Sequence, residues 1–445
     1  MKKNFQHLPL LLLFLVAGCS PRNASPKKTT TPTISVELSS TTPTKSLTRT
    51  ITPSVLIRPT SIATLLAGQG LNQYICEPIL TNLPLNAKIT GTLILDGQNG
   101  SSFLNIESSK RRELDTTASG YRGFSVSPNG KHVAYIQFVN DSSSTNEWLV
   151  IDGVNGQQEA KIPVKEGWDF GSWLDNDRLV FSPFRDWQQA PPVIVVNPFT
   201  NQHQELQSNY PGLKTWRGAG GDPYTFFGPS SSVVYDPSLN LAVYFQTDEN
   251  FQQHTVLWDR KAGKTLAIIR NDPYTPAPLW APDRKAFYLV AYSAERQDGH
   301  GFYDWFRMSA EGQIQRLTHF GDSLTDIVIG GSSLSPNNRY LAFWLNTAES
   351  YRADGGQDGQ YQHLAILDLE TNEVSAYCLP EATPIETSPP VWSPDSQYVA
   401  VTPWLDDSNQ PVIVLNIQDG WMAKVAENIF VRGWMDRSPT ATPTP

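Results

Sequence analysis

The side chains that could carry catalysis or bind a metal are few and widely spaced. The 445-residue chain has seven histidines, and none belongs to a His-x-x-x-His or Glu-x-x-His pair of the kind that binds zinc. No Gly-x-Ser-x-Gly motif presents a nucleophilic serine on a sharp turn. We therefore expect no catalytic residue, no metal site and no cofactor, and we predict that the protein is not an enzyme.

Two short segments are weaker candidates for a site. Residues Asp354 to Gly359 carry carboxylates and glycines that suit calcium, but they lack the alternating acidic positions of an EF-hand loop, so an inserted loop is the better interpretation. Residues Arg296 to Trp305 form either a binding loop or an ordinary hairpin turn.

Cys19 is the reactive residue with the most specific surroundings. Lys2 and Lys3 precede an apolar stretch from Leu8 to Ala17, which is far shorter than the roughly 20 residues of a membrane-spanning helix. The sequence Val-Ala-Gly-Cys at 16–19 resembles the lipobox of bacterial lipoproteins, in which the cysteine thiolate receives a diacylglycerol and the chain is cut before it. The resemblance implies a lipid on Cys19 and a signal peptide over residues 1–18; the alternative is an ordinary signal peptide that contains a cysteine.

Two cysteines remain, Cys76 and Cys378. In an oxidising compartment an even pair can form a bridge, provided that the two Cα atoms lie within roughly 7 Å. A disulfide and two buried free thiols are both open.

The charge of the chain argues against nucleic acid as a partner. The net charge is −9, and the densest basic run, Lys110 to Arg112, is followed at once by Glu113. Binding to a polyanion needs clustered lysine and arginine that displace counterions. We interpret the basic run as a solvated turn.

Both ends of the chain have the composition of disordered segments. Residues 19–68 and 438–445 are rich in serine, threonine and proline and poor in apolar residues. Such segments cannot offset the entropy of ordering with buried surface. We predict a disordered stalk over residues 19–68, a folded domain over residues 69–437 and a disordered tail over residues 438–445.

The folded part contains a repeated turn. An apolar or tryptophan-ended strand leads into a Ser-Pro-Asp or Ser-Pro-Asn turn, and a short apolar strand follows, because proline presets φ and Asp or Asn bonds back to the backbone. Six copies, two of them degraded, have their turns at 128, 175, 237, 282, 336 and 394. A second apolar strand follows each copy, and no stretch predicts a long helix. Repeats of this length with about four strands are typical of propeller blades.

The two ends of the folded part complete one further blade. Residues 92–96 and 102–106 look like middle strands without a first strand, and residues 431–436 look like a first strand with nothing after it. Pairing these pieces would close the ring and remove its exposed sheet edges. We predict an all-β propeller of seven four-stranded blades closed by the C-terminal strand; six or eight blades remain open, since residues 61–84 are hard to assign.

The repeated turn resembles the WD40-like repeat of TolB-type propellers, which also occurs in propeller domains of prolyl oligopeptidase relatives. The resemblance covers about residues 85–436, and four of the six copies match well. The small α/β domain that precedes the propeller in TolB has no counterpart here. The resemblance implies a propeller that binds a partner.

Taken together, these features predict a monomeric, extracytoplasmic lipoprotein at the cell surface or in the periplasm. We expect its propeller to bind a protein, a peptide or a glycan of the cell envelope. The alternative is an enzyme that processes envelope polysaccharide or peptide, with carboxylates converging on the propeller channel.

Overall fold

The computed structural model describes residues 71–84, 87–97, 100–114, 120–140, 145–164, 168–183, 193–206, 216–217, 223–224, 233–247, 252–271, 275–295, 301–322, 328–346, 362–379, 388–403 and 410–436. The chain divides into two compact units, residues 1–55 and 56–445, and all described residues belong to the second. Within these stretches, no helix has the length and apolar character needed to cross a membrane. The predicted signal peptide, stalk and tail, at 1–18, 19–68 and 438–445, lie outside the described residues.

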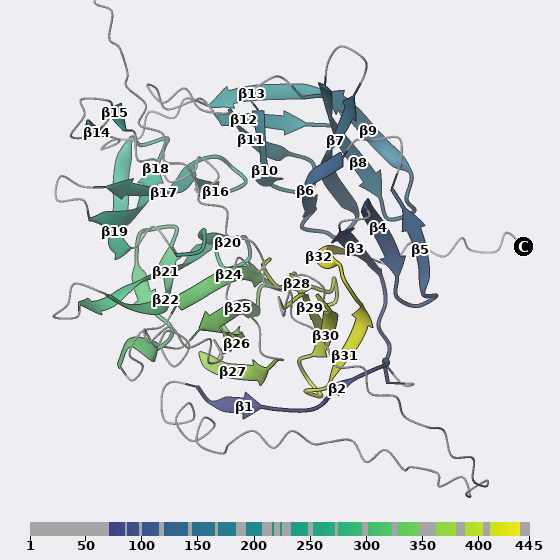
Figure 1. Ribbon diagram of the computed structural model, residues 1–445. Helices are drawn as coiled ribbons and strands as arrows, with labels where there is room; N and C mark the ends of the chain where they lie inside the picture. The colour runs from purple at the N-terminus through teal and green to yellow at the C-terminus, as the bar shows by residue number, and fades with distance from the viewer. Residues whose placement is uncertain are drawn as a thin grey trace, which may run out of the picture. The chain divides into compact units, whose positions relative to one another are not determined.

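Seven sheets, each built on four antiparallel strands, form the blades of a propeller. The first strand of each sheet lies nearest the centre of the ring and the fourth lies outermost (Figure 1). In that order, the strands are β32 (Phe430–Met435), β3 (Thr92–Gly97), β4 (Gly100–Asn105) and β5 (Lys110–Glu113) in blade 1; β6 (Gly120–Val126), β7 (His132–Asn140), β8 (Thr145–Gly153) and β9 (Gln158–Pro163) in blade 2; β10 (Trp168–Trp173), β11 (Leu179–Pro183), β12 (Val193–Asn197) and β13 (Gln202–Leu206) in blade 3; β16 (Val234–Tyr235), β17 (Leu241–Thr247), β18 (Gln253–Asp259) and β19 (Lys264–Asn271) in blade 4; β20 (Leu279–Ala281), β21 (Ala286–Glu295), β22 (Gly301–Ser309) and β23 (Ile314–Arg316) in blade 5; β24 (Val328–Leu334), β25 (Tyr340–Asn346), β26 (Gln362–Asp368) and β27 (Glu373–Cys378) in blade 6; and β28 (Val391–Trp392), β29 (Tyr398–Val401), β30 (Val412–Asn416) and β31 (Met422–Ala426) in blade 7.

The prediction of an all-β, seven-bladed propeller is therefore confirmed, including its closure by the C-terminal strand. In blade 1, β32 pairs antiparallel with β3, so the two partial pieces recognised in the sequence are halves of one sheet. Helix is almost absent from the described residues, where one 3₁₀ turn, η2 (Phe320–Asp322), follows β23.

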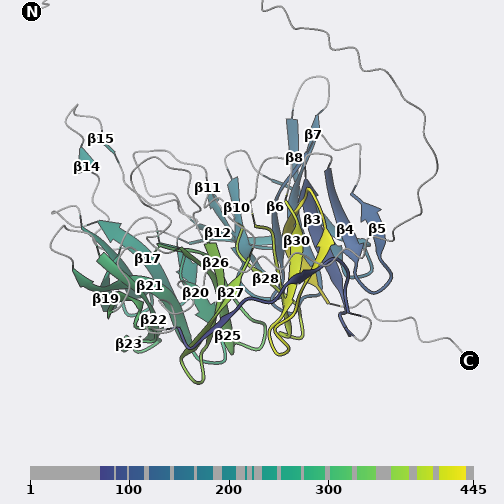
Figure 2. The same ribbon diagram turned by 60° about the horizontal axis from the view of Figure 1, so that its bottom comes forward.

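Antiparallel order within each blade gives the propeller two different faces. The connections between first and second strands and between third and fourth strands lie on one face, which we call the turn face. The connections between second and third strands, and from one blade to the next, lie on the other, which we call the loop face. The two-stranded hairpin of β14 (Trp216–Arg217) and β15 (Pro223–Tyr224), between blades 3 and 4, rises on the same side as the loop-face tips of β7 and β8 (Figure 2).

A hydrogen-bond network explains why the Ser-Pro-Asx turn recurs. In blade 7, the Ser393 hydroxyl donates to Asp395 Oδ1 at 2.6 Å and accepts from the Tyr398 backbone N–H at 2.9 Å. Corresponding bonds recur in blade 6 around Ser335 and in blade 2 around Ser127. The serine thus joins the ends of two strands across the turn, and the acidic or amide side chain orients it.

Each of these turns also needs one residue in the left-handed region of φ. Gly130 takes this place in blade 2 at φ 70°, Asn338 in blade 6 at 55° and Ser396 in blade 7 at 62°. In the degraded copy of blade 4 the place is taken by Leu239 at 60°. A bulky residue is strained there, so the turn is fixed by the hydrogen bonds of neighbouring residues rather than by its own preference.

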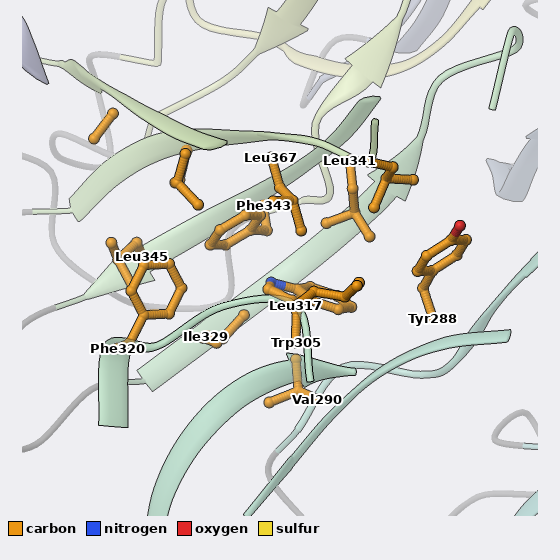
Figure 3. Close-up of a cluster of buried hydrophobic side chains, with 14 of the residues drawn as sticks. Tyr288, Val290, Trp305, Leu317, Phe320, Ile329, Leu341, Phe343, Leu345 and Leu367 are labelled. Atoms are coloured by element: carbon orange, nitrogen blue, oxygen red, sulfur yellow. The ribbon is translucent and has the colours of Figure 1, made fainter. Parts of the chain in front are cut away.

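Successive blades are joined by apolar cores. The largest lies between blades 5 and 6, where Trp305 and Phe343 meet edge to face with ring centroids 5.5 Å apart (Figure 3). Tyr288 and Val290 from blade 5 and Leu341 and Leu345 from blade 6 surround this pair. Successive side chains of each strand point alternately to the preceding and to the following blade. The ring is therefore a continuous series of sheet-to-sheet contacts.

The segment before blade 1 differs from the prediction of four-stranded blades. Strands β1 (Gln73–Ile75) and β2 (Ile79–Leu80) add to the outer edges of blades 6 and 7, each parallel to the fourth strand, and give those blades five strands (Figure 1). A disulfide joins Cys76, just after β1, to Cys378 at the end of β27, with the Cα atoms 4.9 Å apart. Residues 71–84 and 87–91, which we call the N-terminal strap, therefore lie along the outside of the ring.

Candidate functional site

The turn face of the propeller is occupied by its own hydrogen bonds. The Asp436 N–H of blade 1 donates to the Gly130 carbonyl of blade 2 at 2.8 Å, and the Asn129 N–H of blade 2 donates to Asn176 of blade 3 at 3.0 Å. The Asn337 N–H of blade 6 donates to the Ser396 hydroxyl of blade 7 at 3.1 Å. These turns serve to join blades, so the loop face is the better place to look for a site.

The interface between blades 4 and 5 changes character from one face to the other. Towards the turn face it is apolar, with Leu257 and Ala267 packed against Phe287 and Met308. Towards the loop face the same side of blade 4 carries three buried polar side chains, Gln253, Thr255 and Asn271, beside the half-buried ring of Phe245. Residues two apart on a strand share one face of the sheet, so these polar side chains continue the same face as the apolar ones nearer the turn face.

The polar side chains of blade 4 bond to one another. The Asn271 amide donates to the Thr255 hydroxyl at 2.7 Å, and the Thr275 hydroxyl donates to Asn271 Oδ1 at 3.0 Å. Gln253, paired with Asn271 across the two strands, has a buried Oε1 with no hydrogen-bond partner. A buried acceptor of this kind requires a donor, either from water or from a bound molecule.

From blade 5, the side chain of Asp304 faces the same interface and is fully buried. Its Oδ1 accepts from the Thr318 hydroxyl and from the Phe320 N–H, both at 2.7 Å. Its Oδ2 accepts from Arg316 Nε at 3.1 Å and from a terminal Arg316 nitrogen at 2.7 Å. Four hydrogen bonds and one cation compensate the buried charge.

Arg316 connects this buried carboxylate to the surface. Its guanidinium also donates to Asp322 Oδ1 at 2.8 Å, and Asp322 Oδ2 lies 3.1 Å from Nδ1 of His319. The hydrogen bond from Arg316, slightly opposed by burial and supported by His319, holds the pKa of Asp322 below its usual range. His319 is 63% exposed, so its imidazole is fixed through Nδ1 and presented to solvent.

An aromatic pair lies at the same end of blade 5. Tyr292 and Tyr303 stand opposite each other on neighbouring strands, with ring centroids 5.0 Å apart and planes inclined by 27°. The guanidinium of Arg270, at the loop-face end of blade 4, lies 5.2 Å from the centre of the Tyr292 ring. Arginine and stacked tyrosines contact planar or sugar-like groups and also supply hydrogen bonds.

These groups define the candidate site at the loop-face end of blade 5 and of its interface with blade 4. The Tyr292 and Tyr303 rings lie on the side of blade 5 that faces blade 6, where Tyr303 packs against the shared core, and Arg270 of blade 4 contacts Tyr292. The site consists of Gln253, Thr255, Arg270, Asn271, Tyr292, Tyr303, Asp304, Arg316, Thr318, His319 and Asp322. Its charges balance nearly pairwise, and it offers stacking surfaces, neutral hydrogen-bonding groups and one exposed imidazole. In the described part of the chain, no group of three or more His, Cys, Asp or Glu side chains is arranged to hold a metal ion.

The structure distributes the residues singled out in the sequence very differently. Cys19 and the segment from Asp354 to Gly359 lie outside the described residues. Of the predicted Arg296–Trp305 segment, residues 301–305 begin β22 and include Tyr303 and Asp304 of the candidate site. Among the histidines, His319 belongs to the site, whereas His132 bonds to Glu159 at 3.0 Å in blade 2.

Sequence reasoning missed Gln253 and Arg316. Gln253 and Arg316 lie on neighbouring blades and face one interface only through strand register and blade order, which a single sequence does not display. The segment Arg316 to Asp322 does carry a signal, because Arg, Thr, His and Asp are concentrated within seven residues directly after a strand.

Comparison with known proteins extends the fold assignment. No protein-family model and no curated protein sequence matches the chain. Among solved structures, TolB from Acinetobacter baumannii has a TM-score of 0.40 and 15% sequence identity, over 77% of this chain and 82% of TolB. An oligogalacturonate lyase in complex with manganese has a TM-score of 0.44 and 12% identity, over 79% of this chain and 86% of the lyase. Pyrococcus horikoshii acylaminoacyl peptidase has a TM-score of 0.40 and 12% identity, over 69% of this chain and 46% of the peptidase.

The fold is a seven-bladed β-propeller, as the repeat resemblance implies, and TolB is among the solved propellers to which it is similar. The prediction that the protein is not an enzyme is corrected by the same comparison, because two of these propellers are named as a lyase and a peptidase. That prediction relied on the absence of serine and zinc motifs from the sequence, and the absence of these motifs does not exclude other catalytic groups. The propeller fold therefore gives no ground for excluding catalysis.

Proposed function

We propose that this protein is an extracytoplasmic lipoprotein, attached to a membrane through a lipid on Cys19, whose propeller binds a protein, peptide or glycan of the cell envelope. The binding part of the proposal is carried by one observation, the polar and aromatic loop-face end of blade 5 together with the polar end of its interface with blade 4. The anchoring part is carried by the sequence from Lys2 to Cys19.

Three properties of the candidate site support binding. The Arg270, Tyr292 and Tyr303 side chains form a stack that can extend onto a flat ligand group. His319 and Asp322 are exposed and held in place by Arg316, so little side-chain entropy is lost when a ligand binds them. Gln253 Oε1 is a buried acceptor without a hydrogen bond, and a donor group of a ligand would supply one.

The test of binding is affinity capture with the detergent-solubilised full chain, using envelope extract and a glycan array in parallel. Tyr292→Ala and His319→Ala should each reduce capture of the same partner by tenfold or more. Lys264→Ala, at the turn-face end of blade 4, is the matched control and should retain full binding. Capture that is unchanged in both site variants would exclude this site.

A second candidate function is favoured by the His319–Asp322 contact. A carboxylate that bonds Nδ1 of an exposed imidazole fixes the tautomer and leaves Nε2 to accept or donate a proton. On this basis the alternative is an enzyme that acts on envelope polysaccharide or peptide, with His319 as its general acid or base.

Incubation of the purified chain with peptidoglycan fragments, acidic polysaccharide and peptide mixtures tests this alternative. Product release that is abolished in His319→Ala and retained in Lys264→Ala would establish it. Release that is unaffected by His319→Ala would remove His319 from the reaction.

A further inference from the structure

The N-terminal strap crosses three successive blade interfaces from the outside. Leu71 is buried in the core between blades 5 and 6. Ile75 and Ile79 pack against the core between blades 6 and 7. Ile89 is buried in the core between blades 7 and 1, where the ring is closed. The strap therefore contacts the junction on each side of blades 6 and 7.

The strap is hydrogen-bonded to the propeller near both of its ends. At the far end, the Thr90 carbonyl accepts from Trp434 Nε1 at 3.0 Å and the Gly91 carbonyl accepts from the Ile106 N–H at 3.1 Å. The Asn72 N–H donates to the Val374 carbonyl and the Val374 N–H donates to Asn72 Oδ1, both at 2.8 Å. Strand β1 then pairs over three residues with β27, whereas β2 pairs over only two residues with β31. Paired segments this short are weak by themselves.

The disulfide divides the strap into a short part before Cys76 and a longer part after it. Cys76 directly follows β1, and Cys378 is the last residue of β27 in blade 6. A pull on the chain before residue 71 can detach only the residues ahead of Cys76 while the bond is intact. Without the bond, detachment can continue past β2 to β3, the strand that holds the C-terminal strand β32.

We propose that the Cys76–Cys378 disulfide makes blade 6 the mechanical attachment point of the N-terminal tether and protects the β3–β32 closure of the ring from load. That the tether carries a load is the part of this inference that depends on the proposed membrane anchor at Cys19. The fastening itself does not depend on the anchor, because it is a property of residues 71–91 and blades 6, 7 and 1.

Pulling single molecules of the full chain tests the proposal. One handle is attached at the N-terminus and the other at a ligation tag inserted after Lys261, an exposed turn of blade 4. The double variant Cys76→Ser with Cys378→Ser should show an early extension of roughly 50 Å, the length of the residues from Cys76 to Gly91 at about 3.4 Å each. The oxidised chain should show no such step before its blades unfold.

Treating the folded wild-type chain with dithiothreitol provides the same comparison without mutation and covers the case in which the double variant does not fold. The early step should appear after reduction. Identical traces before and after reduction would overturn the proposal, because the strap would then be held by its packing alone. The result is independent of lipid on Cys19, so it separates failure of the fastening from failure of the anchor.

Discussion

The Asp152 carboxylate lies 3.3 Å from the Tyr135 hydroxyl inside the interface between blades 1 and 2. The equivalent strand position is apolar in every other blade, where it is held by Leu104, Val196, Trp258, Met308, Leu367 and Leu415. Arg112 from blade 1 approaches the same carboxylate at 3.5 Å and is itself half exposed. Asp152 is thus a buried acid with two long contacts at a position that belongs to the core.

Replacement by the residue type of the other blades should stabilise the propeller at neutral and alkaline pH. Burial raises the pKa of Asp152, and the Arg112 charge only partly opposes this. For an acid with a raised pKa in the folded state, the stabilising effect is complete below the unfolded pKa and is lost as the pH rises through the folded value. Asp152→Leu should therefore raise the free energy of unfolding by about 1–3 kcal/mol at pH 8, and the gain should shrink towards pH 4.

Thermal unfolding of wild type and variant at pH 4, 6 and 8 measures this difference. Asp152→Asn is the control, because it removes the charge and keeps the polar group. A Leu variant that is less stable at pH 8 than at pH 4, relative to wild type, would contradict the assignment.

The buried serines of the repeated turns should contribute more to the free energy of unfolding than an exposed serine does. Ser393 and Ser335 are both 1% exposed, and each hydroxyl is the partner of a strand N–H. Their replacement by alanine leaves that N–H without its partner, so each change should cost about 1–3 kcal/mol in urea unfolding. Ser108→Ala, at an exposed turn of blade 1, is the control and should cost less than about 0.5 kcal/mol.

The parts of the fold that were predictable are those that repeat. A turn of this kind recurs six times, three of them as Ser-Pro-Asx, and its spacing made the blades predictable. The need to pair a lone strand at residues 431–436 made the closure of the ring predictable. The strap was not predictable, because β1 and β2 are parallel additions of three and two residues that have no turn and no alternation of their own. The candidate site was not predictable as a whole, because Gln253 of blade 4 and Asp304 of blade 5 face the same interface only through strand register and blade order.

Substitutions at the buried and at the exposed end of the Asp304–Arg316–Asp322–His319 network should affect stability very differently. Asp304→Ala removes the buried acceptor shared by Thr318, Phe320 and Arg316 and should destabilise the protein by about 3–5 kcal/mol. His319→Ala removes a side chain that is mostly solvent-exposed and should change the free energy of unfolding by less than about 0.5 kcal/mol. Urea unfolding measures both, and a large loss of stability in His319→Ala would show that the imidazole is structural.

The same network predicts a direction for pH dependence. Because the pKa of Asp322 is lowered in the folded state, its contribution is present above the unfolded pKa and is lost as the pH falls through the folded value. The Arg316→Gln variant should bring the Asp322 titration back towards the ordinary aspartate range of about 3.9. Carboxyl NMR titration of the two proteins measures the shift, and an unchanged titration would remove Arg316 as its cause.

The proposed anchor depends on the thiol of Cys19. If Cys19 carries lipid, the wild-type chain should sediment with membranes, partition into detergent and incorporate labelled fatty acid in a bacterial host. Cys19→Ala cannot be alkylated, because alanine has no nucleophile, so the label should be lost completely. Cys76→Ser is the matched control, since it removes a different cysteine and should leave the label unchanged. A Cys19→Ala chain that remains labelled would mean that the lipid is carried elsewhere, and an unlabelled wild-type chain would leave the apolar stretch from Leu8 to Ala17 as an ordinary export signal.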